Sequence, residues 1–194
     1  LPARWRDTPA IRLLQALTRP AGVAAAVVAP AVASYTAVLL SDTATPTWHG
    51  GRGEMPFVFV GSAAAAAGGL GMLGAPPSQA GPARRMAVAG ALVDLAAAQR
   101  MEASMGLAAE TLHQGRAGHL MGASKACTAL GAAATALFGA RSRAVSAVAG
   151  AALLAGSACT RFGIFEAGQA SARDPKYTVV PQRRRLEHAG SGPG

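Results

Sequence analysis

The chain has 194 residues, of which 51% are hydrophobic and only 14% are charged, and its 18 Lys and Arg outnumber its 9 Asp and Glu. So few charges cannot cover an ordinary soluble surface, which favours a membrane protein. The net charge of +9 is typical of contact with a lipid bilayer and its head groups. Binding to nucleic acid is not expected, because the chain has no basic domain with interleaved aromatic residues.

Long uncharged runs predict the membrane helices. The runs at residues 21–41 and 55–83 hold no charge at all. Each is long enough to cross a hydrocarbon core of about 30 Å as a helix. A soluble helical bundle is the disfavoured alternative, because two such runs are rare in soluble domains. We predict an all-α polytopic transmembrane helical bundle with about five spanning helices, at residues 21–41, 56–75, 86–109, 123–140 and 143–165.

The segments between these spans are short and rich in Gly and Pro, so they predict one compact transmembrane domain over residues 21–168. Residues 1–20 are interpreted as an interfacial loop or linker, and residues 169–194 as a tail. The last two spans are short, and we expect Lys125 and Arg161 near their ends to snorkel towards the interface.

Small residues recur at four-residue spacing in two of the predicted spans. This spacing lets membrane helices approach closely, so we interpret it as a packing pattern. The residues are Gly61, Ala65 and Gly69 in one span and Gly131, Thr135 and Gly139 in the other.

Two acidic residues, Asp94 and Glu102, lie inside the third predicted span. A charge in hydrocarbon costs several kcal/mol and is seldom kept without a use. Their spacing places them about 80° apart around a helix and about 12 Å apart along it, so we expect both to face a common interior. They are candidates for a proton path or a polar quinol pocket. The alternative is that the helix ends early and Glu102 is solvated.

Polar residues follow the end of the first predicted span, in "SYTAVLLSDTATPTWH" (residues 34–49). Tyr35, Asp42 and His49 are candidates for contact with a lipid-soluble redox carrier, whose oxygen atoms need donors and acceptors at this depth. The alternative is that the aromatic residues here anchor the chain at the membrane interface.

The cysteine and histidine positions argue against a metal cofactor held by this chain. The two cysteines are far apart in sequence and form no CxxC motif, so an iron–sulfur cluster is not expected. Haem is not expected either, because a b-type haem needs paired histidines within spans. All four histidines are predicted in loops or in the tail: His49, His113, His119 and His188.

The tail contains an Asp174–Pro175 step, a β-branched run after Tyr177 and a second proline, Pro181. These features predict an extended segment that docks on a partner by edge pairing and charge. The alternative is a disordered basic tail. The candidate docking residues are Asp174, Lys176, Tyr177, Arg183, Arg184 and Arg185.

Several stretches together carry a family resemblance: residues 35–49, "EMPFVFVGSAAAAAGGLG" at 54–71, "AAAQRME" at 96–102 and "SACTRFGIFEAGQASARDPKYTVVPQR" at 157–183. Through them the chain resembles the actinobacterial branch of the NrfD/PsrC family, the membrane subunits of polysulphide and nitrite reductases. Members have eight transmembrane helices in two four-helix bundles. The resemblance therefore predicts that this chain is truncated and that three helices precede it.

The resemblance also implies a function. It predicts a multi-pass subunit of the bacterial plasma membrane that exchanges electrons between the quinol pool, menaquinone or another quinone, and a ferredoxin-like iron–sulfur subunit. That partner is often joined to a molybdopterin catalytic subunit, so this chain would be non-catalytic or quinol-oxidising. Two alternatives stay open: a proton-coupled transporter, in which Asp94 and Glu102 couple protons to substrate, and a purely structural membrane anchor.

Overall fold

The structure is a computed structural model that describes residues 9–190, apart from the side chains of residues 9–15, 19, 184–185 and 188–190. Over these residues the fold is all helical and has no strand, which confirms the predicted fold class. The elements are α1 (Pro9–Ser41), α2 (Pro46–Gly50), α3 (Met55–Gly74), α4 (Gly81–Ser104), the 3₁₀ helix η2 (Gly106–Leu112), α5 (Gly115–Phe138), α6 (Arg143–Arg173) and α7 (Lys176–Gly190).

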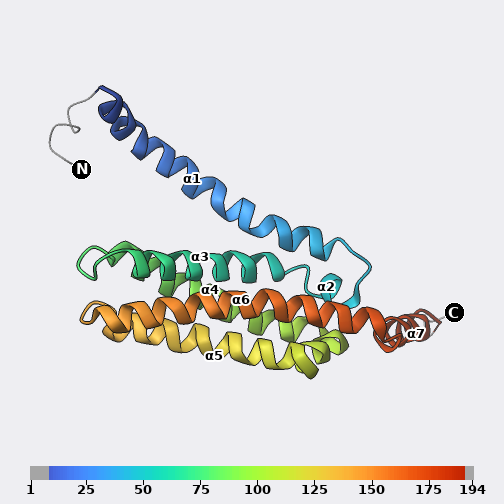
Figure 1. Cartoon of the computed structure of the whole chain (residues 1–194). Coiled ribbons are helices and arrows are strands. Elements are labelled where there is room, and N and C mark those ends of the chain that lie inside the picture. Colours follow the sequence, from blue (N-terminus) through green and yellow to red (C-terminus); the bar gives the residue numbers. More distant parts are fainter. Residues whose placement is uncertain (1–8, 191–194) are drawn as a thin grey trace.

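Helices α3 to α6 form an antiparallel four-helix bundle (Figure 1). α3 packs most extensively on α4, and α5 packs most extensively on α6. The contact between α4 and α5 is much less extensive. α1 diverges from the bundle and meets it only near its own C-terminal end (Figure 1), where Ala37 is fully buried. The bundle is therefore two tightly packed helical hairpins, with α1 as an outlying helix.

Within the described residues, three helices are long and apolar enough to cross a membrane. They are the Ala16–Ser41 part of α1, α3 and α6. α4 and α5 have 24 residues each, but charged residues such as Asp94 and Lys125 interrupt their apolar runs. These findings fit a helical membrane bundle, and the number of spans stays a prediction.

Small residues bring the helix backbones together. A Cβ atom added at Gly61 would lie 2.5 Å from the backbone nitrogen of Asp94, and one at Gly69 would lie 2.7 Å from the carbonyl oxygen of Gly150. A Cβ at Gly131 would lie 3.0 Å from the Leu153 side chain. These distances leave no room for a larger residue, which confirms the packing interpretation of the small-residue pattern.

The bundle interior has three layers along its length. One apolar cluster includes Phe59 and Ile164, and another includes Met72 and Leu153. In the sequence of each bundle helix, buried or half-buried polar side chains lie between the residues of the first cluster and those of the second. We call this set the polar layer, and it consists of Ser62, Asp94, Ser124, Thr128, Ser157, Thr160 and Arg161.

The expected N-terminal loop is wrong from residue 9 onwards, because residues 9–20 belong to α1. Strong helix formers such as Leu and Ala stand on both sides of Pro20, and they extend the helix past it. Residues 1–8 lie outside the described part.

α5 begins at Gly115, eight residues before the predicted span, so His119 lies on an exposed helix face instead of in a loop.

The predicted extended tail is also wrong, because residues 176–190 form α7. The Asp174 carboxylate accepts a hydrogen bond from the Lys176 backbone N–H (2.9 Å), and Pro175 stands directly before the helix. An acidic cap followed by proline is a helix start signal, and here it outweighs the β-branched residues that favoured a strand.

Candidate functional site

The two ends of the bundle differ in construction. At one end, which we call the turn end, α3 joins α4 and α5 joins α6 through short turns (Figure 1). At the other end, the pocket end, α1, α4 and α6 finish and α2, η2 and α7 gather. A pocket of about 680 Å³ opens there. Its lining includes Asp42, His49, Arg52, Met105, Ala108 and Tyr177.

The pocket brings together residues that the sequence analysis treated separately. Asp42 and His49 were candidates for contact with a redox carrier, and Tyr177 was a candidate docking residue. Tyr35, the remaining carrier candidate near them, is not among the lining residues. It lies on α1 with 62% of its surface exposed, as an interfacial or lipid-facing residue would.

The His49 ring has a defined partner. Arg52 Nη1 lies 3.1 Å from His49 Nε2. Arginine can only donate, so Nε2 accepts this hydrogen bond and a neutral His49 carries its proton on Nδ1. The pocket therefore offers one N–H donor at His49 and one carboxylate acceptor at Asp42.

Three contacts fix α2 and with it His49. Trp48 Nε1 donates to the carbonyl oxygen of Ile164 on α6 (2.9 Å). The Thr47 hydroxyl pairs with that of Thr111 on η2 at 2.8 Å. The Trp48 ring lies so close to Gly168 that an added Cβ would come within 2.0 Å of it. Trp48 is thus a buttress between α2 and α6, a role that its place in a predicted loop did not reveal.

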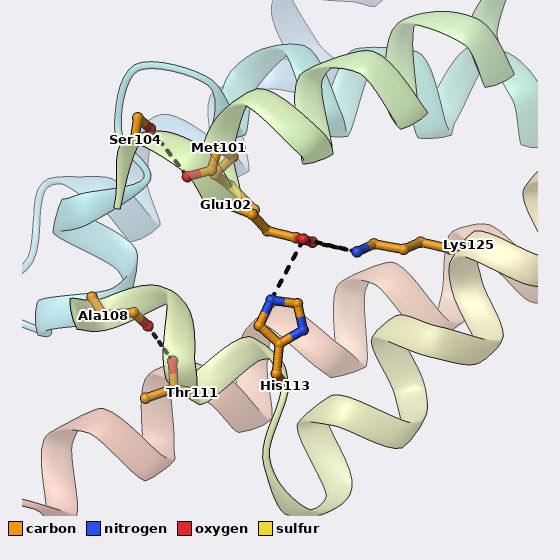
Figure 2. A network of polar contacts seen from close by, with 7 residues as sticks. All are labelled: Met101, Glu102, Ser104, Ala108, Thr111, His113 and Lys125. Atoms are coloured by element: carbon orange, nitrogen blue, oxygen red, sulfur yellow. Dashed lines mark hydrogen bonds and ion pairs between the residues drawn. The ribbon is translucent and has the colours of Figure 1, made fainter. Parts of the chain in front are cut away.

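Glu102 forms an ion-pair network at the junction of α4, η2 and α5 (Figure 2). Lys125 Nζ on α5 lies 2.7 and 2.8 Å from the two Glu102 carboxylate oxygens, and His113 Nε2 lies 3.5 Å from one of them. The Glu102 side chain is only 15% exposed. Lys125 thus has a partly buried carboxylate on the neighbouring helix as its partner, and its expected snorkelling towards the interface stays a prediction.

The same close-up shows how η2 is attached beside this network (Figure 2). Ser104 donates to the Met101 carbonyl at 3.0 Å, and Thr111 donates to the Ala108 carbonyl at 2.8 Å. These hydroxyl groups satisfy carbonyls at the end of α4 and within η2. His113 follows η2 directly and faces Glu102 (Figure 2).

Asp94 lies in the polar layer and is 3% exposed. The nearby cation that attracts it electrostatically is Arg161 on α6. Arg161 Nη1 lies 2.6 Å from the Ser157 hydroxyl and 3.3 Å from that of Ser62, and its guanidinium stacks 5.3 Å from the centre of the Phe59 ring. The expected snorkelling of Arg161 is wrong, because these groups give the cation an inward environment.

Asp94 and Glu102 consequently do not share one interior site. The cation that attracts Asp94 is Arg161, whereas Glu102 pairs with Lys125 and His113. The sequence pattern did not reveal these basic partners. The signal that could have found Arg161 is its position one turn after Ser157 on a span, where a cation is as costly as a carboxylate.

The candidate docking residues mostly hold α7 in place. Asp174 caps α7, Tyr177 is 7% exposed, and Lys176 Nζ binds Glu110 on η2 at 2.7 Å. The hydrogen bond with Glu110 raises the pKa of Lys176 above its ordinary value. Arg183 is exposed, and the side chains of Arg184 and Arg185 lie outside the described residues.

Comparison with known families decides what kind of protein carries this arrangement. The family model NrfD_2, described as polysulfide reductase, matches residues 13–174. This chain belongs to the NrfD family. No curated protein and no solved structure matches the chain.

Membership makes the chain a membrane-embedded subunit of a redox complex. NrfD proteins work with iron–sulfur and molybdopterin subunits. The NrfD match includes Asp42, His49, Asp94, Glu102 and Arg161, and it ends at Asp174, two residues before α7 begins. Both the pocket lining from α1 to η2 and the polar layer therefore lie in the part of the chain that defines the family.

Proposed function

We propose that this NrfD protein exchanges electrons between a membrane quinol and an iron–sulfur subunit in the bacterial plasma membrane, and that the quinol ring binds in the pocket. The observation that carries the proposal is the convergence of Asp42 and His49 on one pocket of about 680 Å³ whose lining also includes Met105 and Ala108. A quinol needs this combination, because its ring is apolar and its two oxygens require polar partners.

The residues divide the chemistry as follows. Oxidation of a quinol to a quinone releases two electrons and two protons. The Asp42 carboxylate accepts one proton from a quinol hydroxyl, the second hydroxyl releases its proton to water in the pocket, and the Nδ1–H of neutral His49 donates to an oxygen of the quinone that forms. Arg52 keeps His49 in this tautomer through Nε2. The electrons pass to the partner's iron–sulfur cluster.

The iron–sulfur partner, with a molybdopterin subunit behind it, docks at the pocket end in this proposal. Electron transfer favours a short path from the pocket, and α7 borders the pocket through Tyr177 and Gln182. Exposed Arg183 adds positive charge beside it, which steers an acidic partner surface.

The test uses the assembled complex in membranes. His49→Gln and Asp42→Asn should each lower quinol-dependent electron transfer by about tenfold to a hundredfold, while partner subunits still co-purify. His119→Gln is the matched control, because His119 is an exposed histidine on α5 outside the pocket. Wild-type turnover in both pocket variants would rule out this binding site.

The buried Asp94 beside Arg161 supports a second candidate, a proton-coupled transporter. A transporter moves protons without a redox partner, so the purified chain in vesicles should acidify or alkalise the lumen when substrate is added. Under the redox proposal, quinol-linked proton movement occurs only in the presence of the iron–sulfur subunit, and Asp94→Asn lowers it there. Substrate-driven proton flux by the chain alone would favour the transporter.

A further inference from the structure

A second concave site lies at the turn end, in the seam between α4 and α5. Its volume is about 450 Å³, and its lining includes Arg84, Arg85, Val88, Ala89, Leu92 and Ala136. The two arginines belong to the first turns of α4. Leu92 lies about 12 Å further along the helix, at about 1.5 Å per residue. The groove therefore has a cationic mouth and an apolar floor.

The mouth is held in position by the surrounding chain. Arg84 Nη1 donates to the Pro77 carbonyl at 2.6 Å. The aliphatic part of the Arg84 side chain packs against Gly139, so closely that a Cβ added at Gly139 would lie 3.1 Å from Arg84 Cδ. A guanidinium has five N–H donors, so this hydrogen bond leaves others available for an anion. Arg85 is exposed beside it. Arg84 is thus placed before any ligand binds.

The charge around the groove has one sign. No Asp or Glu occurs in residues 55–93 or 111–165, which include α3, the start of α4, all of α5 and most of α6. Large apolar side chains on the adjoining helix surfaces remain exposed, with Leu92, Leu137 and Phe138 among them. A ligand for this place needs a negative group at one end and a hydrocarbon chain at the other.

We infer that the groove between α4 and α5 is a binding site for an anionic phospholipid. Its phosphate is recognised by Arg84 and Arg85, and one acyl chain lies along Val88, Ala89 and Leu92. Basic pockets between membrane helices are known to suit such head groups. The lipid would fill the seam that the protein packs least extensively, and so join the two hairpins of the bundle.

The experiment is lipid binding to the full chain in mild detergent, counted by native mass spectrometry. Phosphatidylglycerol should bind at least tenfold more tightly than phosphatidylcholine with the same acyl chains. Arg85→Gln should weaken phosphatidylglycerol binding about fivefold, and Arg84→Gln/Arg85→Gln about 25-fold. Arg85→Gln leaves the Arg84 contact with Pro77 intact, so it tests the site without disturbing the turn.

Two controls separate this site from general attraction. Arg141→Gln removes an exposed arginine of the same end that does not line the groove, and it should change binding less than twofold. Ala136→Leu should fill the groove and weaken binding, whereas Ala133→Leu on an exposed part of α5 should not. Equal binding of the two lipids, equal loss in Arg85→Gln and Arg141→Gln, or full competition by soluble glycerol phosphate would overturn the inference.

Discussion

The turn end and the pocket end are built from the same four bundle helices, yet they use their charges differently. At the turn end, Arg143 donates to the carbonyl oxygens of Met72, Leu73 and Ala75 and so caps the C-terminus of α3. At the pocket end, carboxylates pair with basic side chains from other elements, as Glu102 does with Lys125 and Glu110 with Lys176.

This difference separates an end whose charges stabilise the fold from an end whose side chains can take part in proton transfer. Arginine bound to backbone carbonyls cannot exchange a proton at ordinary pH, so the turn end is electrically fixed. The pocket end holds carboxylates and His49 and His113, which can exchange protons. Substitutions at the two ends should therefore differ in whether stability or turnover changes most.

The largest effect is expected from Gly168→Ala at the pocket end. The new methyl group would lie 2.0 Å from the Trp48 ring and would displace α2 and His49. We expect a loss of stability of about 3 kcal/mol and loss of quinol-linked turnover. Thermal unfolding in detergent measures the first. Gly122→Ala is the control, because an added Cβ there meets nothing within 4 Å. An unchanged melting temperature would contradict the buttress role of Trp48.

A smaller effect on stability alone is expected from Arg143→Met at the turn end. The change removes the hydrogen bonds to the end of α3 and should cost about 2 kcal/mol. Turnover per folded molecule should stay at the wild-type level, because the pocket lies at the other end. Arg141→Met serves as the comparison. If Arg143→Met lowers turnover without lowering the melting temperature, the two ends are not independent.

Glu102→Gln should lower stability by about 1 kcal/mol, since Lys125 then loses its charged partner in a half-buried place. A double-mutant cycle with Lys125→Met measures the pair directly. Glu166→Gln should have little effect, because its partner Arg116 is 84% exposed and 3.7 Å away. Additive effects of Glu102→Gln and Lys125→Met would show that the ion pair contributes nothing.

The smallest effect concerns the pH dependence of α7. The pKa of Lys176 is raised above 10.5 by Glu110, so this contact stabilises α7 fully below about pH 10.5 and loses its effect as the pH rises through the higher folded pKa. A spin label on Val179→Cys should be equally immobile from pH 7 to 9 and become more mobile only when the pH rises through the raised pKa of Lys176. In Lys176→Gln the mobility should show no such step.

The sequence predicted the helices of the bundle well, because uncharged runs and small-residue spacing depend on local chemistry. It failed at residues 176–190, where the Asp174 cap and Pro175 start a helix in a β-branched segment. It also failed at Arg161, whose inward orientation depends on Ser62 and Ser157, and it did not reveal that Lys125 pairs with Glu102. The packing of neighbouring helices brings Ser62 and Glu102 close to these cations.

The candidate site was predicted only in part, because some of its contacts are local in the sequence and others depend on tertiary packing. Asp42 and His49 are close in sequence, so their proximity in space was a short-range expectation. Their combination with η2 and with Tyr177 depends on α7 folding back beside the pocket, which no local pattern encodes. Thr47 and Thr111, which are 64 positions apart, help to complete the site through a tertiary contact.

The pairing of helices into two hairpins also has a consequence for biosynthesis. α3 is apolar enough to enter a membrane by itself, so α4, with its Asp94, leaves the ribosome after a partner is in place. In the second hairpin the order is reversed, because α5, with its Lys125, is made before the apolar α6. We therefore expect stable insertion of α5 only once α6 has been synthesised, whereas α4 meets an α3 that can already be in the membrane.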